Sequence, residues 1–199
     1  MADGGALLVR ATANTPLARW VGVTGQNSIQ IRKTLRVDAP VDRVFQLLAH
    51  HEKFPLFMHH VQHVHMHPDG RSRWIVAGPA GITLEWDAMT TRLEPNRLLA
   101  WRTVSNAAVR HAGSIRFEPH NGGTRLEIQL TYSPPGGALG HGLARLFGAD
   151  PKTELDDDLL RLKGFLETGK IPRDTAARVS QQHLSMAERT SPNGEPLAH

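Results

Sequence analysis

The feature that most constrains the fold is a central stretch, residues 61–132, in which alternating apolar and polar residues are interrupted by turn-forming residues. Alternation with a period of two is typical of a strand that buries one face. The turn signals are clusters of Gly, Pro, Asp and Asn: Pro68-Asp69-Gly70, Gly78-Pro79-Ala80-Gly81, Pro95-Asn96 and Asn121-Gly122-Gly123. Because these connections are short, we predict consecutive antiparallel strands in a meander.

The segment before the meander predicts one more strand and a helix. Residues 28–37 alternate with the same period, and their apolar positions share one face: Ile29, Ile31, Leu35 and Val37. Pro40 suits the first turn of a helix, where its missing N–H leaves no hydrogen bond unmade. The apolar residues that follow recur at helical spacing: Val41, Val44, Phe45 and Leu48.

The segment after the meander predicts a long C-terminal helix, preceded by a shorter one at residues 138–147. Asp150 suits the N-cap of the long helix, Pro151 its first position and Gly169 its C-cap. One face carries a continuous leucine stripe: Leu155, Leu159, Leu162 and Leu166. On the solvated side we expect two ion pairs at i,i+4 spacing: Asp157 with Arg161, and Lys163 with Glu167.

The order of these elements predicts an α+β protein with a helix-grip fold. An antiparallel sheet with one apolar face must bury that face, and the C-terminal helix is the element long enough to cover it. We therefore predict a curved antiparallel sheet of about seven strands wrapped around the long C-terminal helix. The domain is expected over residues 28–170, with polar, aperiodic tails at 1–27 and 171–199.

Composition and charge exclude several classes of protein. The chain has no cysteine, which rules out disulfides, thiolate metal sites and cysteine nucleophiles. Its 23 basic and 19 acidic residues leave a net charge of +4, and the basic residues are spread singly, so we predict no nucleic-acid partner. No apolar run reaches the roughly 18 residues of a transmembrane helix, and the N-terminus lacks the order of a signal peptide. We expect a cytoplasmic protein, with peripheral membrane contact and the oligomeric state left open.

A collinear series of short motifs runs through the predicted domain. In chain order these motifs are Ala39-Pro40, Phe54-Pro55, Phe57-Met58, Arg73-Trp74, Gly78-Pro79-Ala80-Gly81, Glu85-Trp86-Asp87-Ala88, Ala100-Trp101-Arg102, Gly113-Ser114-Ile115-Arg116-Phe117, Gly123-Thr124, Tyr132-Ser133-Pro134-Pro135-Gly136-Gly137, Leu146-Phe147-Gly148, Asp150-Pro151 and Glu167-Thr168-Gly169. In them the chain resembles the START-like (SRPBCC) superfamily, specifically its polyketide cyclase/dehydrase branch, which includes the coenzyme Q-binding proteins. The resemblance implies a helix-grip fold with a cavity for an apolar ligand, but it implies no reaction. Some relatives carry an N-terminal membrane-helix region, whereas we expect this chain to be the stand-alone form.

The candidate site is the inward face of the predicted sheet, because each inward row carries at least one aromatic ring. We predict that a ligand is contacted by these residues: Phe54, Phe57, Trp74, Trp86, Trp101, His111, Phe117, Tyr132, Leu159 and Leu162. The alternative is a filled aromatic core. His111 and Tyr132 are candidate catalytic residues, because they are the polar groups on apolar rows and could orient a ligand oxygen or move a proton. Alternatively, His111 is a core histidine bonded to backbone, and Tyr132 has its hydroxyl in water.

Histidine is concentrated in residues 50–67, which hold seven of the 12 histidines. On a strand, His63, His65 and His67 share one face, and two such histidines can chelate zinc, nickel or copper if further ligands come from elsewhere. We favour solvated histidines on an edge strand over this metal site. The crowding of these residues predicts lowered pKa values and loss of stability in acid. Because the chain has no cofactor fingerprint, we predict no metal and no cofactor.

Three classes of function fit the sequence. The first is binding or carriage of an apolar small molecule, for example a quinone, a polyketide-like aromatic or a lipid, in the internal cavity. The second is an enzyme, a cyclase, aromatase or dehydratase, that uses the same cavity. The third is a module that docks a partner protein through the exposed helix and tails. Carriage requires only volume, whereas catalysis requires a strongly perturbed acid or base inside the cavity.

Overall fold

The predicted meander forms an antiparallel sheet of seven strands in the order β1-β7-β6-β5-β4-β3-β2. The computed structural model describes residues 28–77, 83–104, 107, 110–133 and 151–173. The elements are β1 (Ile29–Val37), α2 (Val41–Ala49), the 3-10 helix η1 (His51–Leu56), β2 (Val61–Met66), β3 (Arg71–Ala77), β4 (Thr83–Glu94), β5 (Leu98–Thr103), β6 (Arg110–His120), β7 (Gly123–Ser133) and α4 (Pro151–Thr168). This order confirms the α+β helix-grip prediction.

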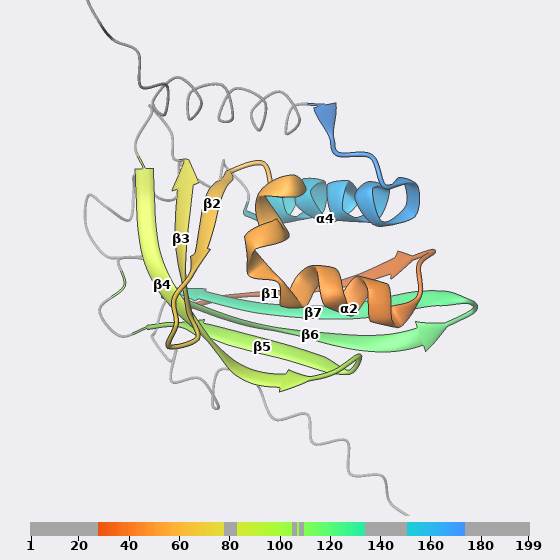
Figure 1. The fold of residues 1–199 in the computed structure, drawn as a ribbon, viewed down its shortest axis with the longest axis horizontal. Coiled ribbons are helices and arrows are strands. Elements are labelled where there is room, and N and C mark those ends of the chain that lie inside the picture. Colours follow the sequence, from red (N-terminus) through yellow and green to blue (C-terminus); the bar gives the residue numbers. More distant parts are fainter. Residues whose placement is uncertain (1–27, 78–82, 105–106, 108–109, 134–150, 174–199) are drawn as a thin grey trace, which may run out of the picture.

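The sheet is strongly curved. In Figure 1, β1, β7, β6 and β5 run beneath α4, while β4, β3 and β2 rise beside it. The strand register shifts at two places, between Val61 and His63 on β2 and between Thr90 and Arg92 on β4. A residue inserted at such a shift bends its strand and increases the local twist. The sheet does not close into a barrel, so β1 and β2 are its two edges.

The hairpin between β6 and β7 confirms the turn predicted at residues 121–123. Asn121 and Gly122 connect the strands with φ angles of 48° and 81°. Two consecutive left-handed residues are typical of a type I′ turn, whose twist matches that of the strands it joins. The next glycine, Gly123, is required for space, because a Cβ there would overlap the backbone carbonyl of Val37. The end of β1 and the hairpin between β6 and β7 are therefore in close backbone contact.

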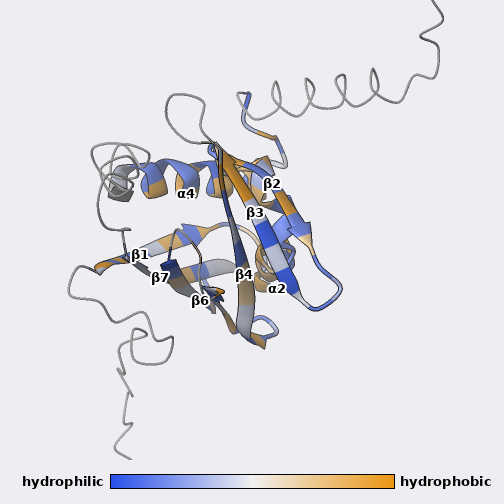
Figure 2. Cartoon of the chain, turned by 90° about the vertical axis from the view of Figure 1, so that its left-hand side faces the viewer, coloured by the Kyte–Doolittle hydropathy of each residue, from blue (hydrophilic) through white to orange (hydrophobic). Residues whose placement is uncertain are grey.

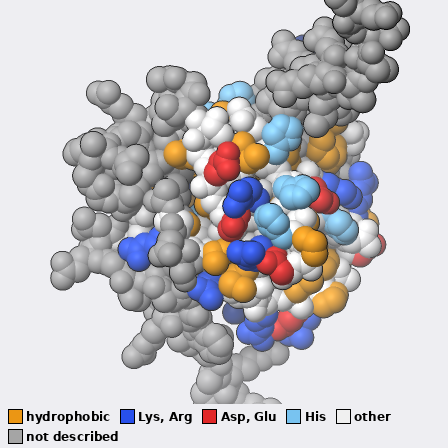
Figure 3. All heavy atoms as spheres, turned by 60° about the vertical axis from the view of Figure 1, so that its left-hand side comes forward, with side chains coloured by type: hydrophobic (Ala, Val, Ile, Leu, Met, Phe, Trp, Pro, Cys, Tyr) orange, Lys and Arg blue, Asp and Glu red, His pale blue; other side chains and the backbone are white. Residues whose placement is uncertain are grey.

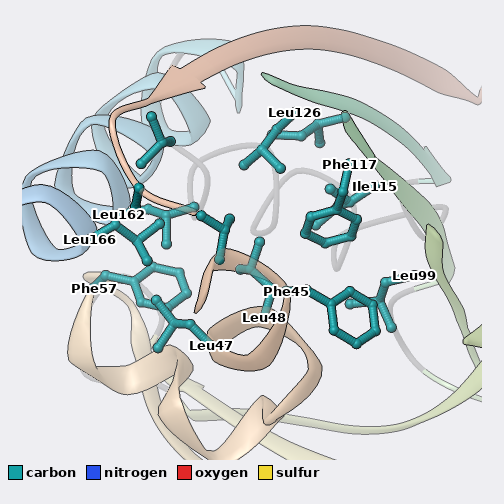
Figure 4. Packing of buried hydrophobic residues seen from close by; sticks show 14 residues of the cluster. Phe45, Leu47, Leu48, Phe57, Leu99, Ile115, Phe117, Leu126, Leu162 and Leu166 are labelled. Carbon is teal, nitrogen blue, oxygen red and sulfur yellow. The ribbon is translucent and has the colours of Figure 1, made fainter. Parts of the chain in front are cut away.

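One end of the sheet is filled by a solid core beneath α2. Figure 2 shows hydrophobic and hydrophilic residues alternating along the strands. The inward apolar side chains of β5, β6 and β7 meet those of α2 and α4 in a cluster shown in Figure 4. Phe45 of α2 packs edge-on against Phe117 of β6, with ring centroids 5.2 Å apart. Among the residues of α2, Val44, Phe45, Leu47 and Leu48 are buried.

Helix α4 is fastened to the edge strand β1 by polar contacts along its length. Near its N-terminal half, Lys33 Nζ lies 2.6 Å from Asp156 Oδ2. Toward its C-terminal end, Lys163 donates a hydrogen bond of 2.9 Å to the carbonyl of Arg36, and Glu167 Oε1 accepts one of 2.8 Å from the Asp38 amide. The predicted pair between Lys163 and Glu167 does form, but it faces β1 instead of standing free in solvent.

The opposite side of α4 is fastened to the segment that leads into the other edge strand, β2. Asp158 Oδ1 accepts a hydrogen bond of 2.9 Å from the His59 amide, and His60 Nε2 lies 3.2 Å from Glu154 Oε2. Asp158 also lies 3.9 Å from Arg161, at i,i+3 spacing, whereas the predicted partner of Arg161 was Asp157. The helix therefore spans the opening between the two edges of the sheet.

The ends of α4 agree with the sequence pattern where they are described. Pro151 is its first residue, and Gly169 follows its last turn with a φ of 69° and a hydrogen bond of 2.8 Å to the Phe165 carbonyl. The predicted tail 1–27, the helix at 138–147, the Asp150 cap and most of the tail 171–199 lie outside the described residues, so the domain limits stay a prediction. None of the described helices is long and apolar enough to cross a membrane.

Candidate functional site

A cavity of about 250 Å³ lies between the inner face of the sheet, η1 and α4. It lies at the end of the fold opposite the α2 core. There, strands β2, β3 and β4 border it on the sheet side, and α4 and η1 cover it. Most of the predicted contact residues border it: Phe54, Phe57, Trp74, Trp86, Trp101, His111, Tyr132, Leu159 and Leu162. The predicted aromatic face therefore encloses space at this end of the fold.

Phe117 is the exception among these residues. Its side chain belongs to the solid core, in edge-on contact with Phe45, and does not border the cavity. It shares its strand face with His111, but it lies six residues further along β6, at the end covered by α2. Sequence parity correctly places the side chain inside, but parity alone does not distinguish the filled end of the sheet from the open end.

His51 borders the cavity although the sequence analysis did not select it. It is the first residue of η1, is only 5% exposed, and lies with its ring centroid 5.8 Å from that of Trp74. Burial, with a smaller contribution from His50, lowers the pKa of His51. The available signal was its position between the apolar face of α2 and Phe54, which puts it at the junction of two covering elements.

Aromatic rings from η1 and β3 form one wall of the cavity. The ring centroids of Phe54 and Trp74 are 5.1 Å apart in an edge-on arrangement, and those of Phe54 and Phe57 are also 5.1 Å apart. Trp74 Nε1 donates a hydrogen bond of 2.9 Å to Ser72 Oγ, so its polar atom is satisfied within the wall. Contacts of this geometry stabilise aromatic pairs beyond simple burial and hold the rings in place.

The indole of Trp101 on β5 occupies the space beside a glycine of the neighbouring strand. A Cβ added at Gly113 would overlap the Trp101 indole and would come within 2.7 Å of Leu130 Cδ2. Gly113 pairs directly with Trp101 in the sheet register. The glycine therefore makes room for the indole, and the indole in turn borders the cavity.

Trp86 and His111 meet across the end of β5. β5 ends at Thr103, which pairs with Ala88 of β4 and lies level with His111 of β6, so Trp86 is two residues beyond the end of β5. Their ring centroids are 5.5 Å apart, with the planes at 85°. The His111 amide donates a hydrogen bond of 3.2 Å to Thr103 Oγ1. This bond fixes the backbone of His111 at the point where the two rings meet.

His111 is neutral at physiological pH. It is half-buried at the cavity with its Nε2 atom buried, and burial lowers its pKa to about 4. Its cross-strand neighbour is Tyr132, whose pKa is raised by burial, so the phenol keeps its proton. Both candidate polar groups on the cavity wall are therefore uncharged near pH 7.

The charged residues at the cavity border are acidic and come from α4. Glu154 and Asp158 border the cavity together with His60, which pairs with Glu154. Burial raises the pKa of Asp158, although the hydrogen bond from the His59 amide and the charge of Arg161 oppose this rise. The described residues that border the cavity include no lysine or arginine.

β2, the histidine-rich strand, is an edge strand of the sheet. His63 and His65 of β2 are exposed, and the rings of His65 and His67 meet edge-on with centroids 5.6 Å apart. Figure 3 shows histidine side chains among acidic and basic ones on this face. Nearby, Asp87 forms an ion pair of 2.9 Å with Arg73. Within the described part of the chain, no three His, Asp or Glu residues lie close enough to hold a metal ion.

Comparisons with known proteins agree with this architecture. A protein of Deinococcus radiodurans with a crystal structure is 30% identical, and the match covers 71% of this chain and all of that one, with a TM-score of 0.56. The Zhui aromatase/cyclase of a Streptomyces species is 18% identical over 72% of this chain and 98% of its own, with a TM-score of 0.55, and shows likeness of fold. An uncharacterised 17.2 kDa protein of Streptomyces lincolnensis is 26% identical over 69% of this chain and 89% of its own.

The assignment of this chain to a family comes from a match to a family model. This family model matches residues 37–160, from the end of β1 to the second half of α4, and so includes every strand that borders the cavity except most of β1. The family's description joins polyketide cyclases and dehydrases with lipid transport, which is a role in binding or cyclising hydrophobic ligands. The chain therefore belongs to the polyketide cyclase / dehydrase and lipid transport family.

Proposed function

We propose that this protein binds an apolar small molecule in the cavity under α4 and carries it without changing it. The observation that supports this proposal is the cavity itself, whose walls combine aromatic and aliphatic side chains with very few polar groups. Each 100 Å² of apolar ligand surface moved from water into such a site contributes roughly 2.5 kcal/mol to binding. A few polar groups at fixed positions then orient the ligand.

The volume of the cavity favours a compact ligand. At about 250 Å³ it lies just below the range of roughly 300–1,000 Å³ in which drug-sized ligands bind. A ring system such as a polyketide-like aromatic or a quinone head group suits this volume better than a long acyl chain. The resemblance to coenzyme Q-binding proteins makes the quinone head group one candidate, and the fold shared with an aromatase/cyclase makes an aromatic polyketide the other.

The second candidate function is a cyclase, aromatase or dehydratase reaction in the same cavity. The observation that favours it is the cross-strand pair of His111 and Tyr132 on the cavity wall, a proton acceptor beside a proton donor. General acid–base catalysis is most efficient when the pKa of the group lies near the working pH. With a pKa of about 4 for His111 and a raised pKa for Tyr132, both groups are weak catalysts near pH 7, so we place carriage first.

A matched pair of substitutions on α4 tests whether the cavity is the binding site. Leu159 borders the cavity, whereas the adjacent Leu160 is 64% exposed. Leu159→Trp should fill the cavity and abolish binding of an aromatic probe measured by calorimetry, while Leu160→Trp should leave the affinity unchanged. Equal affinities in both variants, with folding verified by circular dichroism, would place binding outside the cavity.

Carriage and catalysis are distinguished by whether the bound ligand is chemically unchanged when it is released from the protein. The purified full chain is examined by native mass spectrometry, and any bound molecule is extracted and identified by chromatography. The extracted ligand is then returned to the protein that has been stripped of it. A carrier returns the ligand unchanged after prolonged incubation, whereas a cyclase or dehydratase returns a product of different mass or retention time.

A further inference from the structure

Three side chains that border the cavity have a buried ring nitrogen without a partner within the described residues: His51 Nδ1, Trp86 Nε1 and His111 Nε2; the last two belong to rings in contact with each other. Trp86 Nε1 and His111 Nε2 are both buried and make no hydrogen bond. Both side chains border the cavity, and their rings are in edge-on contact. A buried polar group without a partner is unfavourable in a folded protein, and the great majority of such groups are satisfied. Two of them side by side in the wall of a cavity therefore require an explanation.

From this pair we infer that the cavity selects a neutral ligand with a hydroxyl group, which takes up the hydrogen bonds left unmade by Trp86 and His111. The inference deepens the proposed function and rests on it. The indole N–H can only donate, so it requires an acceptor on the ligand. A neutral imidazole nitrogen can accept, so it is served by a donor. A single hydroxyl group supplies both, because it has one O–H and two lone pairs.

The position of the two rings makes this contact possible. They come from β4 and β6, which β5 separates in the sheet, and their ring centroids are 5.5 Å apart at the end of β5. Both nitrogens are buried in the observed arrangement, so a hydroxyl reaches them when the rings rotate slightly toward the cavity that they border. The hydrogen bond from the His111 amide to Thr103 holds the backbone while the ring turns.

The charges around the cavity argue against an anionic ligand. The described residues that border it provide no lysine or arginine, and His111 is uncharged because burial lowers its pKa to about 4. Glu154 and Asp158 add carboxylates at the helix border, and the nearby His60 is already paired with Glu154. A buried carboxylate or phosphate without a counter-charge is strongly disfavoured. Fatty acids and phospholipid head groups are therefore excluded from the preferred class.

Three probes with the same ring system and different substituents test this inference on the full chain. Naphthalene, 2-naphthol and 2-naphthoate are titrated into the protein at pH 7.5, and the dissociation constants are measured by calorimetry. Since a hydrogen bond contributes modestly in water and two are made here, we expect 2-naphthol to bind about tenfold tighter than naphthalene. We expect 2-naphthoate to bind more weakly than 2-naphthol by at least about tenfold, because its charge stays uncompensated.

Substitutions then test whether the preference for 2-naphthol over naphthalene depends on the ring nitrogens of Trp86 and His111. Trp86→Phe and His111→Phe each remove the unpartnered nitrogen and keep an aromatic ring, so each should bring the affinity for 2-naphthol close to that for naphthalene. Trp101→Phe is the matched control, because Trp101 borders the same cavity but its ring nitrogen is not among the buried ones without a partner. This variant should change the affinities for naphthalene and 2-naphthol by the same factor. The ratio of the two affinities is read in every variant, which cancels any general loss of packing.

The outcomes separate this inference from the function on which it rests. A hydroxyl preference that persists in both Trp86→Phe and His111→Phe overturns the inference while leaving ligand binding intact. Tightest binding of 2-naphthoate overturns the neutral class in the same way. If none of the three probes binds to the unmodified protein, the proposed function itself is overturned.

Discussion

Lowering the pH from 7.5 to 5.0 should remove about 2 kcal/mol of folding stability through His111 alone. Burial lowers the pKa of this histidine from 6.5 to about 4. Between those two values the unfolded chain binds a proton that the folded protein does not, so the free energy of unfolding falls by about 1.4 kcal/mol for each pH unit. The contribution is complete above pH 6.5, is lost as the pH falls toward 4, and amounts to about 2 kcal/mol at pH 5.0. His51, whose pKa is also lowered by burial, acts in the same direction.

The measurement is urea unfolding of the full chain at pH 7.5, 6.5 and 5.0, compared with the variant His111→Phe. The variant cannot titrate at this position, so it should lose about 2 kcal/mol less than the unmodified protein over the same interval. Comparing the change with pH, and not the absolute stability, removes the effect of altered packing. His63→Gln is the control, because it removes an exposed histidine of β2. Equal losses in the protein and in His111→Phe would refute the assignment of acid sensitivity to this buried ring.

Four further substitutions, two of them with a matched control, test the fold and the site. Leu162→Ala, at a side chain only 2% exposed, should cost about 2–5 kcal/mol in chemical unfolding, whereas Leu160→Ala, at 64% exposure, should stay within about 0.5 kcal/mol of the parent. Gly113→Ala should push the Trp101 indole out of place, cost about 1–3 kcal/mol and weaken binding of aromatic probes, as seen in tryptophan fluorescence and titration. Asp158→Ala should lower the melting temperature because the His59 amide loses its acceptor, at about 1–3 kcal/mol, while Asp158→Asn, which keeps a carbonyl oxygen, should lose less. Gly122→Ala should cost about 1 kcal/mol through its φ of 81° alone, since nothing lies within 4 Å of the added Cβ; a larger loss would indicate a contact that the structure does not show.

The strands and the covering helix could be predicted because their signals are local. Alternation along β6 and β7, the turn at Asn121 and Gly122, and the leucine stripe of α4 each depend on residues close together in the sequence. Local geometry fixes which face of a strand a residue occupies, and that was enough to place Trp74 and Trp101 inside. The residues of the aromatic face could therefore be predicted from the sequence alone.

The limits of the prediction lie where distant segments meet. Phe117 belongs to the solid core because Phe45 arrives from α2, which no periodicity along β6 reveals. Trp86 touches His111 across the end of β5 at Thr103, and the end of one strand cannot be read from the residues of its neighbours. The predicted loss of stability in acid was ascribed to crowding on the histidine-rich strand. The structure adds a cause that the sequence pattern does not show, because burial lowers the pKa of His51 and of His111.

The way α4 bridges the two sheet edges also has a consequence for how the protein is made. The groups that fasten the helix to β1 are 123 to 129 residues apart in the sequence, and β1 itself pairs with β7, the last strand to be synthesised. A nascent chain leaving the ribosome therefore carries its first strand unpaired, with the apolar inner face uncovered, until nearly the whole domain has emerged. Such long-range closure slows folding and lengthens the time in which aggregation competes. We expect ribosome-bound chains that end before α4 to bind chaperones strongly and to be released from them once the helix is complete.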